Sequence, residues 1–224
     1  VMENIQNTIT EKEALSRALN AVSNWRRLFG KINFNGLTID QQKGLIGELL
    51  FLSYILDNKP DEIDNLSKWT STERGFESKD FTMGSVGVEI KFSSSKQPRI
   101  RISNERQLDP ESLDKLFLVL YSAEPVKDKG ISLNSMVENI RNKIKIADEL
   151  KEFNVKLELI GYFDDDKDHY NNMYSIKKIF VFEVASGFPR IVKSQLPLGV
   201  YDTSYSIEVS SIESYIVNIE KTLL

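Results

Sequence analysis

Asp80, Glu89 and Lys91 lie close together in the segment KDFTMGSVGVEIKFSSSKQPRIRIS, residues 79–103. A two-residue turn at Gly84-Ser85, with glycine first as a type II′ hairpin prefers, would place Asp80 directly opposite Glu89. Because side chains alternate between the faces of a strand, both carboxylates and the Lys91 ammonium would share one face. Facing carboxylates repel each other, and a hard divalent cation such as Mg²⁺ would offset that repulsion. With a lysine beside it, this arrangement suits metal-assisted hydrolysis of a phosphodiester.

The opposite face of the same hairpin would be wholly apolar. It would carry Phe81, Met83, Val86, Val88, Ile90 and Phe92. This alternation predicts a hairpin that packs one face on the core. The alternative interpretation of the polar face is a solvated surface on which Lys91 and neighbouring bases screen the two acids, since polar outer faces are ordinary in antiparallel sheets.

A third acid, Glu48, lies in the apolar segment GLIGELLFL, residues 44–52. A helix there would keep Glu48 from escaping wholly to solvent, and a buried carboxylate is costly unless it is paired or bound to a metal. Gly44 and Gly47 each weaken a helix by roughly 1 kcal/mol relative to alanine. They predict the close approach of another backbone, that of the Asp80 hairpin. The alternative is a half-exposed glutamate at the edge of an apolar stripe.

Hydrophobic periodicity predicts the elements that must hold these side chains. Helical spacing predicts three helices, over residues 10–29, about 38–56 and 132–151. Thr38 and Gln41 have capping-box spacing at the start of the second. Alternating or continuous apolar runs predict strands within 78–103, 113–124, 177–185 and 204–210, followed by a short last helix.

Two further features fix the expected organisation. The run 113–124 is apolar enough to lie centrally in the sheet, and the polar sequence FDDDKDHYNN is expected to be a loop. The element order predicts one mixed α/β (α+β) domain built round one sheet. We expect an N-terminal helical region (1–36), a core that holds the candidate residues (37–210) and a C-terminal helix (211–224).

Composition excludes several classes of site. The chain has 224 residues and a net charge of −4, so contact with a polyanion must be local rather than through bulk charge. The absence of cysteine excludes disulfides, zinc–thiolate sites and cysteine nucleophiles, and the single histidine, His169, excludes a multi-histidine metal site. With no signal-peptide pattern and no long uninterrupted apolar run, we expect a cytoplasmic protein.

The ordered set of a helical glutamate, an aspartate and Glu-x-Lys on the next strand resembles the PD-(D/E)xK nuclease superfamily, which has the restriction-endonuclease-like fold. Here the set is Glu48, Asp80 and EIK at residues 89–91. The chain is similar to a branch of PD-(D/E)xK proteins associated with restriction and phage-defence gene clusters. The similar segments are GLIGELLFL, KW, KDF…VEIKFSSS, IRISNERQLD, LIGYFD and GFPRIVKSQLPLGVYDTSYSI. The position before Asp80 departs from the pattern, because it is Lys79 and not proline.

The resemblance implies a central mixed sheet flanked by helices and a Mg²⁺-dependent endonuclease that cleaves double-stranded DNA. It implies that Asp80 and Glu89 are metal ligands, that Lys91 positions the attacking water, and that Glu48 is an auxiliary ligand or orienting residue. A homodimer would suit the cutting of both strands at a symmetric site, and other restriction or defence subunits could be partners. A non-catalytic nuclease-fold module that binds DNA or a partner subunit is the alternative. A glycosidase acid–base pair is disfavoured, because an adjacent ammonium lowers the pKa of an acid.

Residues after Lys91 are candidates for DNA contact. They are Lys96, Arg99, Arg101, Arg106 and Gln107. In PRIRIS the two arginines would project together on one face of a strand, where they could contact phosphates, and Gln107 could orient a phosphate or a base. The alternative is a solvated strand edge protected by charge.

Overall fold

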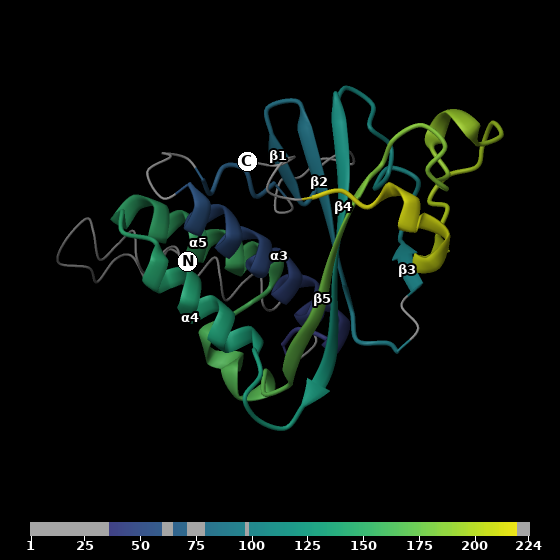
Figure 1. Ribbon diagram of the computed structural model, residues 1–224. Coiled ribbons are helices and arrows are strands. Elements are labelled where there is room, and N and C mark those ends of the chain that lie inside the picture. Colours follow the sequence, from purple (N-terminus) through teal and green to yellow (C-terminus); the bar gives the residue numbers. More distant parts are fainter. Residues whose placement is uncertain (1–35, 60–64, 71–78, 97–98, 219–224) are drawn as a thin grey trace.

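The computed structural model describes residues 36–59, 65–70, 79–96 and 99–218 (Figure 1). The helices are α3 (Ile39–Asn58), α4 (Leu133–Lys143) and α5 (Ala147–Ile160), with short 3₁₀ helices η1 (Asp164–His169), η2 (Lys193–Gln195) and η3 (Val209–Tyr215). The strands are β1 (Phe81–Met83), β2 (Val86–Ser93), β3 (Arg99–Ile102), β4 (Lys115–Val126), β5 (Met173–Glu183) and β6 (Tyr205–Glu208). None of the helices in these ranges combines the length and the apolar character that a membrane span requires.

A four-stranded mixed sheet forms the centre of the fold. Its strand order is β1-β2-β4-β5, with β2 and β4 parallel and the other pairs antiparallel. β4 is central, as its apolar run predicts, and seven of its residues from Leu116 onward are buried. Figure 1 shows α3, α4 and α5 together on one side of this sheet and the two-stranded β3–β6 sheet on the other. The predicted mixed α/β class with a central sheet and flanking helices is confirmed.

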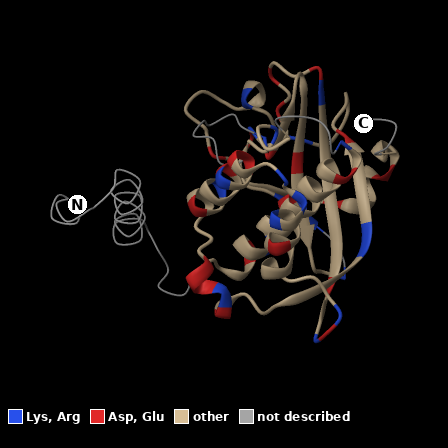
Figure 2. Ribbon diagram, turned by 90° about the vertical axis from the view of Figure 1, so that its left-hand side faces the viewer, with Lys and Arg blue, Asp and Glu red and all other residues tan. Residues whose placement is uncertain are grey.

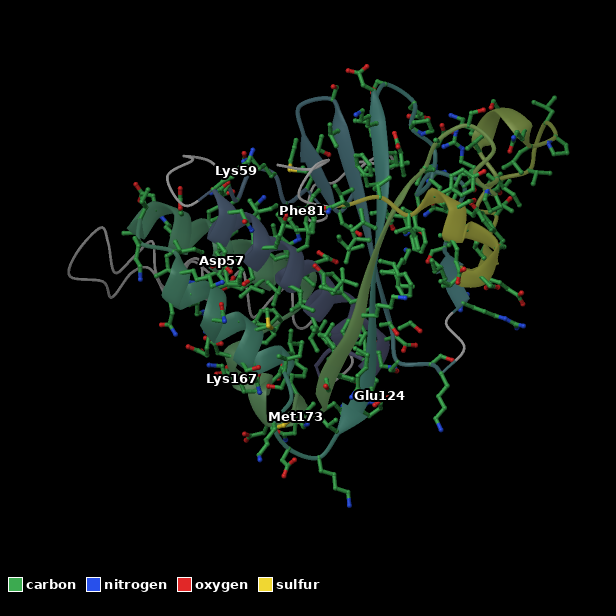
Figure 3. All side chains as sticks on the ribbon, in the orientation of Figure 1. Asp57, Lys59, Phe81, Glu124, Lys167 and Met173 are labelled. Carbon is green, nitrogen blue, oxygen red and sulfur yellow. The ribbon has the colours of Figure 1, made fainter. Side chains whose placement is uncertain are left out.

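The β1–β2 hairpin has the predicted register, with Phe81 opposite Val88 and Met83 opposite Val86. Gly84 has φ +61°, whereas Ser85 has an ordinary negative φ, which is the combination that a type II′ turn requires. The apolar face packs in the core beneath α3, where Phe81 is fully buried (labelled in Figure 3). The sequence alternation therefore determines which face of the hairpin meets the helices.

The polar face of β2 is covered rather than solvated. In the parallel ladder, Glu89 lies beside Leu118 and Lys91 beside Leu120. Those leucines belong to a second apolar cluster, which includes Ile100 and Ile102 of β3 together with Phe182, Ile207 and Ile212. The interpretation of this face as a solvated surface is therefore wrong for Glu89, because Glu89 lies on the side of the central sheet that β3 and β6 cover.

Helix α3 begins with the predicted capping box. Thr38 Oγ1 accepts from the Gln41 amide at 3.3 Å, and the Thr38 amide donates to Gln41 Oε1 at 2.9 Å. A Cβ placed on Gly47 would lie 3.1 Å from Ile90 Cγ2, so this glycine allows α3 to approach β2 as expected. At Gly44 the prediction was wrong for the described part of the chain, since none of its atoms lies within 4 Å of a Cβ placed there.

The two glycines therefore predict different responses to alanine. Gly44→Ala is expected to raise the free energy of unfolding by about 0.5–1 kcal/mol, since it gains helix propensity in open space. Gly47→Ala is expected to gain less or to destabilise, because its methyl group would press on Ile90. Urea unfolding of both variants measures the difference, and an equal gain for both would contradict the close α3–β2 contact.

The single helix predicted over 132–151 is two helices. Ile144 and Ile146 are both extended, with φ −70° and −93°, and they separate α4 from α5, which continues to Ile160. The apolar spacing runs through the break because Ile144 and Leu150 pack on the same core. The predicted loop 163–172 contains η1, and the described part of the predicted C-terminal helix 211–224 holds the end of η3. The helix predicted over 10–29 lies outside the described residues.

Candidate active site

Asp80 lies directly before β1 and bonds to the backbone of β2. Its Oδ2 accepts a hydrogen bond from the Ile90 amide at 2.6 Å, while its carbonyl accepts from the Thr70 amide at 3.0 Å. The residues before Thr70 continue this contact through a bridge between Trp69 and Phe81. Asp80 is thus held between two backbone segments, and the structure gives its Oδ1 no hydrogen bond to a described residue.

Glu89 and Lys91 form a buried ion pair on the covered face of β2. Lys91 Nζ lies 2.8 Å from Glu89 Oε1, and the Glu89 residue is only 2 % exposed. Burial opposes the charged form of Lys91, but the Glu89 and Asp80 carboxylates outweigh it and raise the pKa of Lys91. Lys91 therefore carries its charge at neutral pH and serves as the counter-ion of this site.

The charges round Asp80 act in the opposite direction. Burial raises the pKa of Asp80 well above its usual value, and the nearby Glu89 and Glu48 carboxylates raise it further. Lys91 and the hydrogen bond from the Ile90 amide only partly offset this effect. Three acids thus act on one another round Lys91, and the buried Lys79 adds a second ammonium near Asp80 and Glu89. A further positive charge would stabilise the ionised acids.

Glu48 reaches this group from α3 and is held by Trp69. Trp69 Nε1 donates to Glu48 Oε2 at 2.7 Å, and Glu48 is half-buried. Trp69 is itself fixed by Lys156 of α5, whose Nζ donates to the carbonyls of Leu66 at 3.0 Å and Trp69 at 2.7 Å. Lys156 therefore holds the backbone of Trp69 in place, and the Trp69 indole fixes the orientation of the Glu48 carboxylate.

Trp69→Phe tests this support. The substitution keeps an aromatic ring on Phe153 but removes the donor to Glu48, so we expect a loss of about 1–3 kcal/mol in the free energy of unfolding. If cleavage uses Glu48, the rate at saturating substrate should also fall, by about tenfold, since Glu48 loses its orientation. Tyr162→Phe, which removes a hydroxyl donor to Asn134 away from the site, is the control and should leave the rate unchanged. Unchanged stability and rate would contradict the role of the indole.

The donor set suits a hard cation. Carboxylate oxygens are the ligands that Mg²⁺ prefers, and it commonly binds one or two of them together with waters and phosphate oxygens. Asp80 Oδ1 and Glu89 Oε2 accept no hydrogen bond from the described residues. Within these residues, no three His, Cys, Asp or Glu side chains form a closed metal-binding group. Asp80 and Glu89 could therefore hold a divalent cation, and the assignment of Asp80, Glu89 and Glu48 as metal ligands remains a prediction.

Gln107 contacts the lysine of the site. Its Oε1 accepts from Lys91 Nζ at 3.1 Å and from the Ser103 amide at 2.7 Å. The Ser103 amide fixes which way the Gln107 amide group points, so Gln107 orients the Lys91 ammonium. That Gln107 orients a phosphate or a base remains a prediction. Its Oε1 already accepts two hydrogen bonds, from Lys91 and Ser103.

Sequence reasoning missed two residues that support the site, Trp69 and Lys79. Lys79 is buried, and its ammonium donates to the Arg106 carbonyl. Burial lowers the pKa of Lys79, against the opposing effect of Glu89 and of other nearby acids. The Lys79 side chain also packs against Gly87, since a Cβ placed on Gly87 would lie 3.0 Å from Lys79 Cγ. The sequence did mark Lys79 in one way: it lies directly before Asp80, at the position where the superfamily pattern has proline.

The predicted DNA-contacting residues separate into two groups. Arg99 pairs with Glu208 of β6 at 3.1 Å, and Arg106 lies 3.6 Å from Asp202 and 3.8 Å from Glu105. Lys96 and Arg101 are exposed and form no ion pair with a described residue. Figure 2 shows acidic and basic residues interspersed along the ribbon, consistent with a local contact for a polyanion rather than a broad basic face.

Comparison with known proteins gives one family. The family model described as "Putative PD-(D/E)XK family member, (DUF4420)" matches residues 1–210. Searches of curated proteins and of solved structures give no significant match. The matched range contains Glu48, Asp80, Glu89 and Lys91, together with every described helix and strand except part of η3.

Proposed function

Since the chain belongs to the PD-(D/E)XK family DUF4420, we propose that it is a Mg²⁺-dependent endonuclease of restriction type that hydrolyses phosphodiester bonds of double-stranded DNA. One observation carries the proposal: a buried Glu89–Lys91 pair lies beside Asp80, whose pKa is raised by burial and by two further carboxylates. A purely structural ion pair needs one acid for one ammonium, whereas Asp80 and Glu48 add two carboxylates here, and the buried Lys79 ammonium near Glu89 and Asp80 offsets only part of them. The surplus negative charge supports a site for a divalent cation.

The side chains have distinct roles in this proposal. Asp80 and Glu89 hold the cation through the oxygens that face no donor, and Glu48 orients from α3. Mg²⁺ bound there would supply Lewis-acid polarisation of the scissile phosphate and lower the pKa of a coordinated water. Lys91 donates to the attacking water or to a phosphate oxygen, and Gln107 keeps its ammonium in place.

A cleavage assay on unmodified duplex DNA tests the proposal. Wild type is expected to cut only when Mg²⁺ or Mn²⁺ is present, and Asp80→Ala is expected to lose the activity. Asp128→Ala, at an exposed acid away from the site, is the matched control and should cut like wild type. Metal-independent behaviour that is equal in all three proteins would reject the enzyme. Salt-sensitive DNA binding that survives in all of them would then favour a non-catalytic binding module.

We further propose that the protein acts in the cytoplasm as a homodimer, alone or with other restriction or defence subunits, because a two-fold assembly can cut both strands of a symmetric site. Mass measurement in solution with and without a duplex that is cut tests this assembly. A strict monomer that cuts both strands in one binding event would contradict it.

A further inference from the structure

The segment 191–205 forms an ordered loop with an apolar tip. The Val200 amide donates to the Pro197 carbonyl at 3.0 Å, and Gly199 has φ +87°, so residues 197–200 form a tight turn in which glycine takes the left-handed position. At this turn Leu198 is fully exposed, and Val200 and Tyr201 are 48 % and 73 % exposed. We call Leu198, Val200 and Tyr201 the apolar tip. Single exposed apolar side chains are ordinary, but three within four residues of a closed turn indicate a contact surface.

The loop is joined at its base. The Ile191 amide donates to Tyr205 Oη at 3.1 Å, which closes the two ends of the loop on each other. Burial raises the pKa of Tyr205, whereas the hydrogen bond from Ile191 and the charges of Arg190 and Lys91 act against that rise. The apolar tip therefore projects from a closed base, at which β6 begins with Tyr205 opposite Ile102 of β3.

A second set of contacts connects the loop to the segment that orients Lys91. The Thr203 amide donates to Glu105 Oε2 at 2.8 Å, and Asp202 lies 3.6 Å from Arg106. Glu105 is buried, and Gln107, two residues later, accepts from Lys91. The loop and the active-site lysine thus contact one supporting segment, residues 105–107.

Charge and size indicate what the tip contacts. Strand β6 continues directly from the loop and pairs with β3, which presents the exposed Arg101 opposite Ser206; no acid among the described residues pairs with Arg101. An apolar tip on a loop that leads into a strand paired with the exposed Arg101 suits the bases and phosphates of DNA. A stable protein interface buries about 800 Å² on each partner, which is more than three side chains on one turn provide. A narrow turn tipped with leucine is of the right size to enter a DNA groove.

We infer that the 191–205 loop is the base-contacting element of this protein, and that Leu198 and Tyr201 insert into a groove of duplex DNA while Arg101 contacts its phosphates. The inference rests on the proposed function and specifies how the same site receives its substrate. Leu198 makes apolar contact with bases, and its contribution to affinity is therefore independent of counter-ion release. Arg101 contributes through charge, and its contribution depends on salt.

The test measures the affinity of the full chain for a labelled duplex at several salt concentrations, with Ca²⁺ replacing Mg²⁺. Leu198→Ser is expected to bind about tenfold more weakly at every salt concentration with an unchanged salt dependence, because only apolar contact is lost. Arg101→Gln is expected to reduce the slope of log affinity against log salt by about 1. Leu159→Ser, at a half-exposed leucine of α5, is the matched control and should bind like wild type.

Affinity of Leu198→Ser equal to that of wild type would overturn the inference while leaving the proposed function intact. So would a change of oligomeric state in Leu198→Ser without a change in DNA affinity, which would identify the tip as a contact between copies of the chain. Failure of wild type to bind or cut any duplex is a different result, since it would reject the proposed function itself.

Discussion

Lys91→Met is expected to lower the free energy of unfolding by about 3 kcal/mol and to reduce cleavage by about 10²–10⁴-fold. The substitution preserves most of the aliphatic packing but leaves Glu89 buried without its ammonium partner at 2.8 Å. An unpaired buried carboxylate is the larger cost, because the surrounding leucines offer it no donor. Chemical unfolding without metal gives the stability change, and a metal-dependent cleavage assay gives the rate.

Two further variants show whether the loss belongs to the pair. Lys178→Met removes an exposed lysine that lies over the Phe180 ring, and it should cost less than about 1 kcal/mol without affecting cleavage. Combining Lys91→Met with Glu89→Leu should recover most of the stability, since both charges are then absent, while the protein remains inactive. A Lys91→Met protein that is as stable and as active as wild type would contradict the buried pair and its role.

Asp80→Asn is expected to stabilise the metal-free protein by about 1 kcal/mol at neutral pH while reducing cleavage by at least about 10²-fold. The amide keeps an acceptor for the Ile90 amide but removes the charge that Glu89 and Glu48 repel. A gain of stability with a loss of activity is characteristic of a residue whose charge is present for function. Thermal unfolding in the presence of a chelator, beside the cleavage assay, measures both effects.

The stability gain of Asp80→Asn should depend on pH in a definite direction. Because the folded state raises the pKa of Asp80 above the usual 3.8, the folded protein binds this proton more tightly than the unfolded chain does. Ionisation of Asp80 therefore lowers stability progressively as the pH rises from about 3.8 through the raised pKa. The advantage of Asp80→Asn should be full above that raised pKa and should disappear below pH 3.8.

Saturating Mg²⁺ provides the complementary measurement. It should stabilise wild type by about 2.7 kcal/mol at a hundred times its dissociation constant, and it should stabilise Asp80→Asn much less. Asp128→Asn is the control at an exposed acid and should behave like wild type throughout. Destabilisation of the metal-free protein by Asp80→Asn at neutral pH would show that the carboxylate is satisfied without a cation.

Local features of the fold could be predicted from the sequence where a short pattern of apolar, turn or capping residues determines the structure. The hairpin register follows from alternation and a Gly84 turn, the start of α3 from its capping box, and the central position of β4 from its continuous apolar run. The break between α4 and α5 could not be predicted in this way. Both helices turn the same kind of side chain toward one core, so the spacing of apolar residues does not change at the break.

The candidate site was only partly accessible from sequence for a similar reason. Asp80, Glu89 and Lys91 are near in sequence, so strand geometry alone places them together. Trp69 reaches the site through tertiary packing, and an indole donor carries no sequence pattern that names its acceptor. Gln107 was a candidate for DNA contact, but its contact with Lys91 depends on the same kind of packing. The burial of the polar face likewise depends on β3 and β6, which come from distant parts of the chain.

Anomalous scattering from crystals grown with Mn²⁺ tests the central claim most directly, since Mn²⁺ prefers the same oxygen ligands as Mg²⁺. The account predicts a strong anomalous peak within coordinating distance of both the Asp80 and the Glu89 carboxylates, with Lys91 Nζ close by. A peak elsewhere, or no peak at metal concentrations that support cleavage, would contradict it.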